Sequence, residues 1–152
     1  MSRRWLEDFG VGQRFEPADD YEITPERLTA YAAEYDPQPI HLDPEVAERE
    51  MFGGIVASGW HGLSATMRLM VGSDLFAGGP IVGVGIDRLR FLQPIRAGDR
   101  LRAEGEVLEV RPSRTHPERG YLVLRITTRR SDGAPVLTQD WTLLVPRRTG
   151  IG

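Results

Sequence analysis

Three residue types are missing from this 152-residue chain: cysteine, lysine and asparagine. Without cysteine, the chain has no thiol nucleophile, no disulfide framework and no thiolate metal ligand. All 19 positions that carry lysine or arginine are arginine, which excludes Schiff-base chemistry and a phosphate-loop lysine. A GC-rich genome would remove lysine and asparagine together, so codon bias explains both absences more simply than function does.

Long apolar runs are missing as well. No stretch approaches the roughly 20 apolar residues that cross a bilayer, and Met1 to Gly10 has no run of signal-peptide length. We therefore expect a soluble, cytoplasmic protein with no membrane partner. A net charge of −3 disfavours a basic nucleic-acid surface. With 40% hydrophobic residues the chain can bury a core, and its length predicts one domain over residues 1–152.

The first half of the chain carries helix signals. Thr24 is a plausible N-cap with Pro25 at the first helical position, and the apolar spacing predicts a helix to about Tyr35. A short helix is expected near residues 44–50, with Asp43 as its N-cap. Ser58 indicates the N-cap of a longer helix that reaches about residue 76. The apolar stripe expected on that helix comprises Trp60, Leu63, Met67, Leu69, Met70, Val71 and Leu75.

After Gly78-Gly79-Pro80 the hydrophobic period changes from helical spacing to two. Four strands are expected, at about residues 82–93, 101–111, 120–130 and 136–146. Gly98-Asp99 and Asp132-Gly133 supply turn chemistry between them. Helices followed by antiparallel strands predict the α+β class, in which a sheet covers one long apolar helix.

The chemistry concentrates in Tyr35-Asp36-Pro37-Gln38-Pro39-Ile40-His41-Leu42-Asp43. Two prolines separate Asp36 from His41, and each disfavours helical geometry in the residue before it. This predicts a stiff, extended, non-helical segment that holds an acid and an imidazole toward one small molecule. Ser58-Gly59 follows at the start of the long helix, where backbone N–H groups lack acceptors. A base, an acid and an anion-stabilising donor are what addition of water to a conjugated carbonyl requires.

This segment resembles the hydratase motif of the MaoC-like dehydratases, or (R)-specific enoyl-CoA hydratases, roughly Asp-x-x-Pro-(Ile/Leu/Phe)-His-x-Asp. Residues 52–59 and 90–99 match further blocks, so the resemblance covers about residues 24–145. Position 38 is often asparagine or alanine in characterised members and is glutamine here. The resemblance implies the hot-dog fold, an antiparallel β-sheet wrapped around a long central α-helix, and at least a homodimer with sites near the subunit interface.

The resemblance also implies the roles of the site residues. Asp36 would be the general base that activates water, and His41 would hold the same water and manage the proton that reaches the α-carbon. The N–H of Gly59 would bind the enolate oxygen, as a donor at a helix N-terminus. Ser58 would support this donor and contact substrate. Trp60 and His61, from the first turn, are expected to line the substrate pocket.

The expected reaction is reversible hydration of a trans-2-enoyl-CoA to an (R)-3-hydroxyacyl-CoA. No metal or other cofactor is expected beyond the coenzyme A of the substrate, because the oxyanion donor replaces a Lewis acid. The phosphates of coenzyme A are expected to bind arginine side chains. The candidates are Arg68, Arg88, Arg90 and Arg96. Bulky residues at the pocket, Trp60 among them, favour a short acyl group.

Two alternatives remain open at this stage. A hot-dog acyl-CoA thioesterase would cleave the same thioester, but such enzymes more often use a lone carboxylate on the central helix, where this chain offers only Asp74 near the far end. A non-catalytic acyl-CoA-binding or partner subunit is the other alternative. It would have no use for Asp36 and His41 together.

Overall fold

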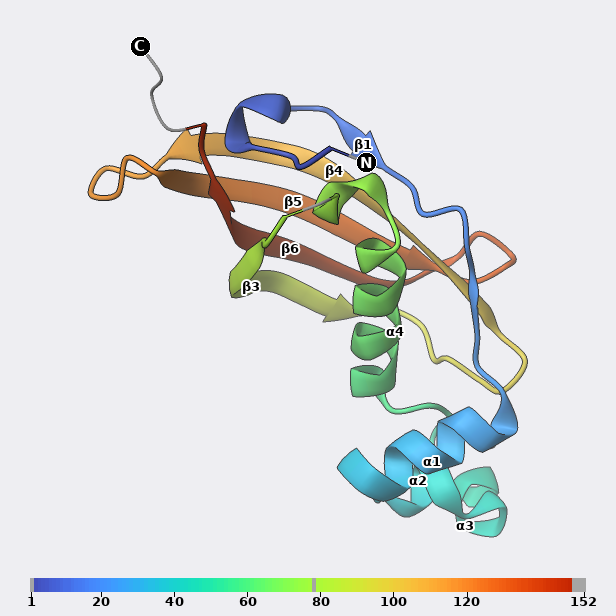
Figure 1. The fold of residues 1–152 in the computed structure, drawn as a ribbon. Helices are drawn as coiled ribbons and strands as arrows, with labels where there is room; N and C mark the ends of the chain where they lie inside the picture. Colours follow the sequence, from blue (N-terminus) through green and yellow to red (C-terminus); the bar gives the residue numbers. More distant parts are fainter. Residues whose placement is uncertain (1, 78, 149–152) are drawn as a thin grey trace.

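A computed structural model describes residues 2–77 and 79–148. Its strands are β1 (Arg14–Phe15), β2 (Tyr21–Glu22), β3 (Val82–Phe91), β4 (Arg100–Pro112), β5 (Arg119–Arg129) and β6 (Pro135–Pro146). Its α-helices are α1 (Pro25–Tyr35), α2 (Pro39–Leu42), α3 (Pro44–Arg49) and α4 (Gly59–Val71), and the 3-10 helices are η1 (Leu6–Asp8) and η2 (Asp74–Phe76). The predicted α+β class is confirmed: a curved sheet crosses one face of α4, and α1 to α3 cluster beyond its N-terminal end (Figure 1).

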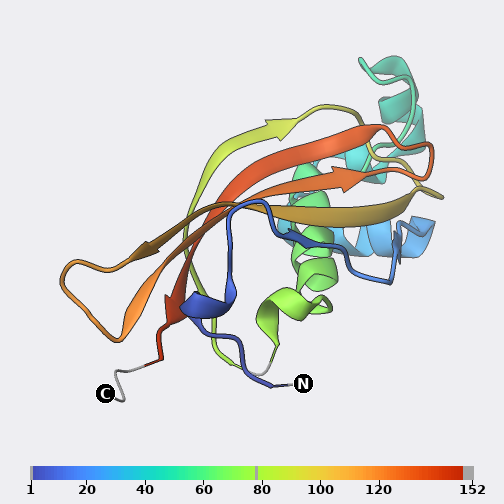
Figure 2. The same ribbon diagram turned by 90° about the horizontal axis from the view of Figure 1, so that it is seen from above.

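The sheet is antiparallel, with the strand order β1-β4-β5-β6-β3, and β2 adds to one end of β4. β4 and β5 bury alternate side chains against the helix, as their period of two predicts, and β6 does so from Trp141 to Pro146. β3 is the edge strand, and its pairing with β6 is interrupted between Asp87 and Arg90. Arg88 in this irregular segment has a φ of 53°. The long strands curve together around α4 (Figure 2).

The face of α4 that meets the sheet carries small residues in the first three turns of the helix. Gly62, Ala65 and Thr66 are buried there, because the helix lies very close to the strands. A Cβ added at Gly62 would come within 2.9 Å of side chains of both Ile95 and Leu137. Large side chains at these three positions would force this part of the helix away from the sheet.

The predicted apolar stripe of this helix is therefore partly wrong. Leu69, Met70 and Leu75 are buried as expected. Trp60, Met67 and Val71 instead lie on the exposed side, and Trp60 keeps 63% of its surface accessible. The helix is also shorter than predicted, since Gly72 ends it and Ser73 caps the separate helix η2 by accepting a hydrogen bond from the Leu75 N–H.

The caps of the other helices confirm their predicted starts. Thr24 accepts a hydrogen bond from the Arg27 N–H at the start of α1. Asp43 accepts from the N–H groups of Glu45 and Val46 at the start of α3.

The segment that carries Asp36 and His41 is only partly extended. Gln38 is extended, with φ −81° and ψ 142°, and Asp36, with φ −152° and ψ 68°, is also outside the helical region, as the following prolines require. The prediction that the whole segment is non-helical is wrong, because α2 begins at Pro39 and includes His41. Proline is well tolerated at a first helical position, where its missing N–H costs nothing. The tight turn brings His41 back toward Asp36.

Candidate active site

Asp36 and His41 lie in contact. The Nε2 atom of His41 is 3.1 Å from Oδ2 of Asp36. Asp36 is the C-cap of α1, and its N–H donates to the carbonyl of Ala32, so the helix end fixes its backbone. His41 follows on α2 and is only 5% exposed. Two helix ends thus hold the acid and the imidazole that the sequence predicted would converge.

The backbone of the strand-like segment before α4 orients His41. Its Nδ1 is 2.6 Å from the carbonyl oxygen of Val56. A carbonyl only accepts, so Nδ1 carries the proton in this contact. Nε2 can donate a hydrogen bond to the Asp36 carboxylate only when Nε2 also carries a proton. The pair is therefore suited to hold and pass one proton.

Ser58 ties the start of α4 to the same carboxylate. Its hydroxyl donates to Asp36 Oδ2 at 2.7 Å and accepts from the N–H of Trp60 at 3.3 Å. Gln38 donates from Nε2 to Asp36 Oδ1 at 2.7 Å. The hydrogen bond from Gln38, followed by those from Ser58 and the influence of His41, lowers the pKa of Asp36 against the opposing effect of burial. The carboxylate is therefore held in its ionised, basic form.

Gly59 opens α4 beside this carboxylate. Within the described residues 2–77 and 79–148, no hydrogen bond engages its N–H, as expected at a first helical position. The ring of Phe91 packs directly on Gly59, and an added Cβ would lie 2.6 Å from Cε1 of that ring. Glycine here allows β3 and the helix start to approach each other.

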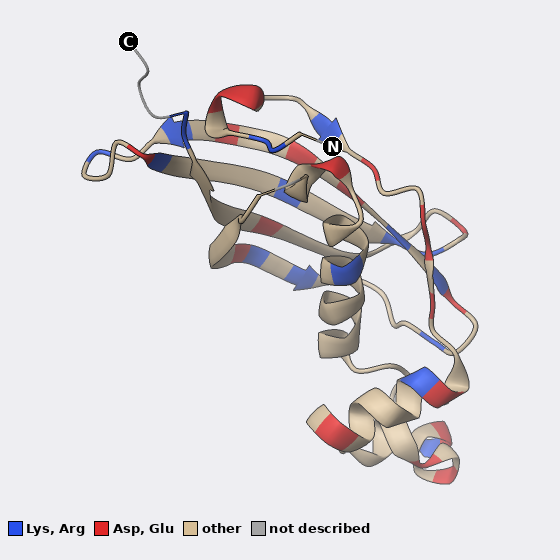
Figure 3. Ribbon diagram, viewed as in Figure 1, with Lys and Arg blue, Asp and Glu red and all other residues tan. Residues whose placement is uncertain are grey.

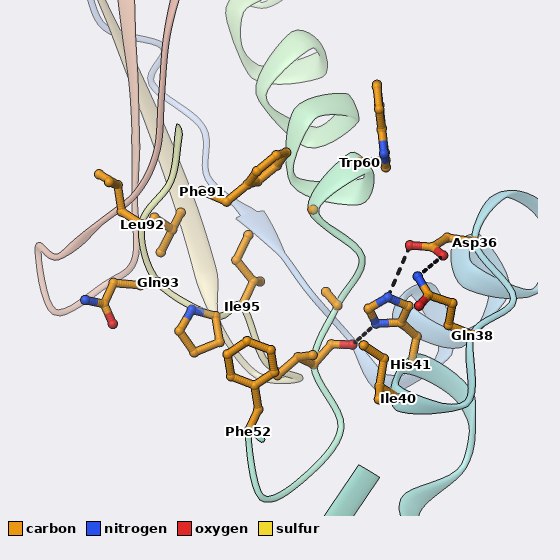
Figure 4. Close-up of a pocket in the computed structure, with 15 residues that line it drawn as sticks. Asp36, Gln38, Ile40, His41, Phe52, Trp60, Phe91, Leu92, Gln93 and Ile95 are labelled. Carbon is orange, nitrogen blue, oxygen red and sulfur yellow. Dashed lines mark hydrogen bonds and ion pairs between the residues drawn. The ribbon is translucent and has the colours of Figure 1, made fainter. Parts of the chain in front are cut away.

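These residues surround a cavity of about 390 Å³ (Figure 4). At one end of it lie the side chains of Asp36, Gln38 and His41. The rest of its wall is mainly apolar and is formed by Ile40, Phe52, Val56, Ala57, Gly59, Trp60, Phe91, Leu92, Gln93, Pro94, Ile95 and Val136. An apolar cavity with a few convergent polar groups suits a small organic group that carries one reactive centre.

Of the six predicted site residues, the structure brings four to the cavity wall: Asp36, His41, Gly59 and Trp60. Ser58 stands behind them as the hydrogen-bond donor to Asp36. The sixth, His61, is outside the lining.

His61 faces α1 and β2 instead of the cavity, and it is 3% exposed. Its ring stacks on Tyr31 with 4.6 Å between centroids, and Nε2 lies 3.2 Å from the hydroxyl of Tyr21. Burial, with a smaller effect from Arg27, lowers the pKa of His61. This placement favours a role in docking α1 onto α4 over a role in the pocket wall.

Two contacts were not predicted from the sequence, that of Gln38 with Asp36 and that of Phe91 with Gly59. Gln38 lies inside the motif between two prolines, so its position was a usable signal. Phe91 is distant in sequence from Gly59, and nothing local pointed to their contact. Among the candidate arginines, Arg96 donates to the carbonyl of Phe52 at 2.7 Å and so supports the loop that forms one wall of the cavity.

The described part of the chain holds no group of three or more His, Asp or Glu residues placed to bind a metal ion. Of the helices in that same part, none has the length and apolar character needed to span a membrane.

Known proteins share this chain's sequence pattern and fold. The MaoC like domain family matches residues 8–125. A MaoC-like dehydratase from Rhodospirillum rubrum is 39% identical, with a TM-score of 0.90 over 97% of this chain and 99% of that one. The R-hydratase PhaJ1 from Pseudomonas aeruginosa is 25% identical, with a TM-score of 0.74 over 96% and 88% of the two chains.

A similar relative is the 3-hydroxyacyl-thioester dehydratase Z of Mycobacterium tuberculosis, 32% identical over 102 residues, which are 66% of this chain and 68% of that protein. The structural neighbours have the hot-dog fold that the sequence predicted. The family match spans most of the chain and includes Asp36, His41 and Gly59. The chain therefore belongs to the MaoC-like domain family, whose members include hydratases and dehydratases.

Proposed function

We propose that this protein reversibly adds water to a trans-2-enoyl-CoA and forms an (R)-3-hydroxyacyl-CoA. The observation that carries the proposal is one arrangement: the Asp36–His41 pair at the end of an apolar cavity, beside the Gly59 N–H, which no group in the described part of the chain engages. The names of the similar hydratases and dehydratases support the same reaction class.

The first step is attack of water on the β-carbon of the enoyl thioester. Asp36 accepts a proton from the water while the new C–O bond forms. The π electrons move from the C=C bond toward the thioester oxygen, which gives an enolate. The α-carbon then takes a proton from the Asp36–His41 pair, the enolate returns to a thioester, and H and OH have been added across the double bond.

Negative charge develops on the thioester oxygen during this step. A backbone N–H at the start of a helix is a suitable partner, because it is already oriented and the helix dipole favours an anion there. Gly59 supplies this donor, and Ser58 keeps the helix start next to the base through its bond to Asp36. Base and oxyanion donor thus act on opposite ends of the same conjugated system.

The thioesterase alternative has weaker support. Asp74, the carboxylate that it would use, is exposed on η2 beyond the C-terminal end of α4 and does not line the cavity. A non-catalytic role leaves the contacts of Asp36, His41 and Ser58 without a purpose.

Incubation of crotonyl-CoA with the purified chain tests the three possibilities. Hydration removes the enoyl absorbance and yields 3-hydroxybutyryl-CoA, whose (R) configuration is checked by chiral chromatography. Release of free thiol would instead indicate a thioesterase. Neither change, with this substrate and with longer enoyl-CoA substrates, would contradict the proposed function.

The active form in this proposal is a homodimer that pairs through β3. This ten-residue edge strand exposes Val82, Val84 and Ile86. Exposed Trp60, Met67 and Val71 add an apolar surface on α4, where Arg68 is the one arginine (Figure 3). Trp60 on this surface and the exposed Phe91 at the end of β3 also line the cavity wall. A second copy would cover the strand edge and close the cavity on its open side.

A further inference from the structure

Gln38 forms a direct hydrogen bond with the carboxylate of Asp36. Its Nε2 donates to Asp36 Oδ1 at 2.7 Å, while the other carboxylate oxygen, Oδ2, receives both Ser58 and His41. Each carboxylate oxygen has about two acceptor sites. Among the described residues, both acceptor sites of Oδ2 are therefore used, and one acceptor site of Oδ1 is not. Asp36 and Gln38 both line the cavity, so the remaining site of Oδ1 is available to a water there.

The backbone around Gln38 is restrained, so this contact depends on the length of the Gln38 side chain. Pro37 and Pro39 flank it and fix their own φ angles. The Gln38 N–H also donates to the Asp36 carbonyl at 2.8 Å. These constraints limit how far the backbone of Gln38 can shift toward the carboxylate, and a side chain shorter by one C–C bond, roughly 1.5 Å, would place its amide farther from Oδ1.

We infer that Gln38 is a positioning residue of this site: its amide holds Asp36 Oδ1, the oxygen that takes the proton from water, and an asparagine at the same position does not. This inference rests on the proposed hydration function and adds the atom of the base and the group that orients it. Oδ2 serves as the anchored oxygen through Ser58 and His41. Gln38 prevents the carboxylate from turning about its Cβ–Cγ bond and so keeps Oδ1 toward the substrate.

The contact also has a pH consequence. In the part of the chain that the structure describes, the groups that bond to the Asp36 carboxylate are the amide of Gln38, the hydroxyl of Ser58 before α4 and the imidazole of His41 on α2. The bond from Gln38 is the largest influence on Asp36 and lowers its pKa. Loss of that bond raises the pKa of Asp36, so a higher pH is needed to ionise the base.

The test compares Gln38→Asn and Gln38→Ala with a matched control, Gln13→Asn, which makes the same change far from the cavity, where Gln13 accepts from the Gly10 N–H. With crotonyl-CoA, both Gln38 variants are expected to lose about tenfold in kcat, the size of one hydrogen bond, with little change in KM. The acid limb of their kcat–pH profile moves to higher pH. The control keeps the profile of the unmodified chain.

Two results would overturn the inference. An unchanged kcat and acid limb in Gln38→Asn would remove Gln38 from the base, and a raised KM with unchanged kcat would make it a substrate contact. Titration of the ¹³C-labelled Asp36 carboxyl by NMR gives a readout that needs no substrate. Should the unmodified chain prove inactive on enoyl thioesters, the proposed function fails, and with it the role in hydration. Equal Asp36 titration in Gln38→Asn and the unmodified chain would then remove the contact itself.

Discussion

At the scale of single residues, the Asp36–His41 contact predicts that both side chains are needed for hydration. Asp36→Asn keeps the shape of the side chain and loses its basicity, so hydration of crotonyl-CoA should fall by about 10²–10⁴-fold. His41→Ala should have a similar effect, and the double variant should be little worse than either single one, because the two groups act as a unit. Steady-state kinetics of the three variants, with circular dichroism as the folding control, measures this. Multiplicative losses in the double variant would contradict a shared role.

The proposed oxyanion donor, the N–H of Gly59, can be tested by replacing Gly59 with proline or with alanine. Proline at position 59 removes the N–H and fits a first helical position, since Ser58 before it is extended. Alanine keeps the N–H, but its Cβ would lie 2.6 Å from the Phe91 ring, so Gly59→Ala perturbs the site by packing alone.

We therefore predict the outcome in a Phe91→Ala background, which makes room for either residue. In that background, Gly59→Pro should lose about 10²–10³-fold in turnover relative to Gly59→Ala. Turnover of the two double variants on crotonyl-CoA is the measurement. Similar turnover in both, with both folded, would show that Gly59 is only a packing residue.

At the scale of secondary-structure elements, one buried hydrogen bond joins α4 to β5. The hydroxyls of Thr66 and Thr128 are 2.6 Å apart, and both side chains are fully buried. Thr66 also donates to the carbonyl of Gly62 at 2.8 Å. Its one hydrogen is thereby used, so Thr128 is the donor and Thr66 the acceptor between the two hydroxyls.

This direction predicts unequal losses of stability. Thr66→Val leaves the buried Thr128 O–H without an acceptor and should lower the free energy of unfolding by about 1–3 kcal/mol. Thr128→Val should cost less, because Thr66 still has Gly62 as its acceptor. The double variant should cost less than the sum of the two. Urea unfolding followed by fluorescence provides the values, and a greater loss for Thr128→Val would reverse the assignment of donor and acceptor.

At the scale of the whole molecule, the exposed edge of β3 predicts self-association. Val84→Arg places a charge in the first half of this strand, on a residue that is exposed in the single chain. It should leave the fold intact and convert a dimer into a monomer with much lower activity. Light scattering at micromolar concentration measures the mass, and Val11→Arg, at an exposed valine just before β1 on the opposite side of the sheet, is the control. A monomeric and fully active unmodified chain would contradict the dimer.

Much of the local structure and part of the site are readable in the sequence. Proline after Asp36 ends α1, Thr24, Asp43 and Ser58 cap the helices that follow them, and the period of two predicts the long strands. These signals are local because each rests on the geometry of a few adjacent residues. Asp36, His41 and Gly59 could be proposed as site residues for the same reason, because the motif rests on their spacing along the chain.

Contacts between distant segments were decided by the tertiary structure alone. A helical period shows which residues share a face, but α4 carries apolar residues on two faces, and only close packing on the sheet selects the small ones, such as Gly62 and Ala65, for burial. The same packing turns His61 toward Tyr31 and away from the cavity. It also brings Phe91 onto Gly59. The sequence identified the residues that we propose to carry the chemistry, and the packing of α4 between the sheet and α1 decided which of its residues face the site.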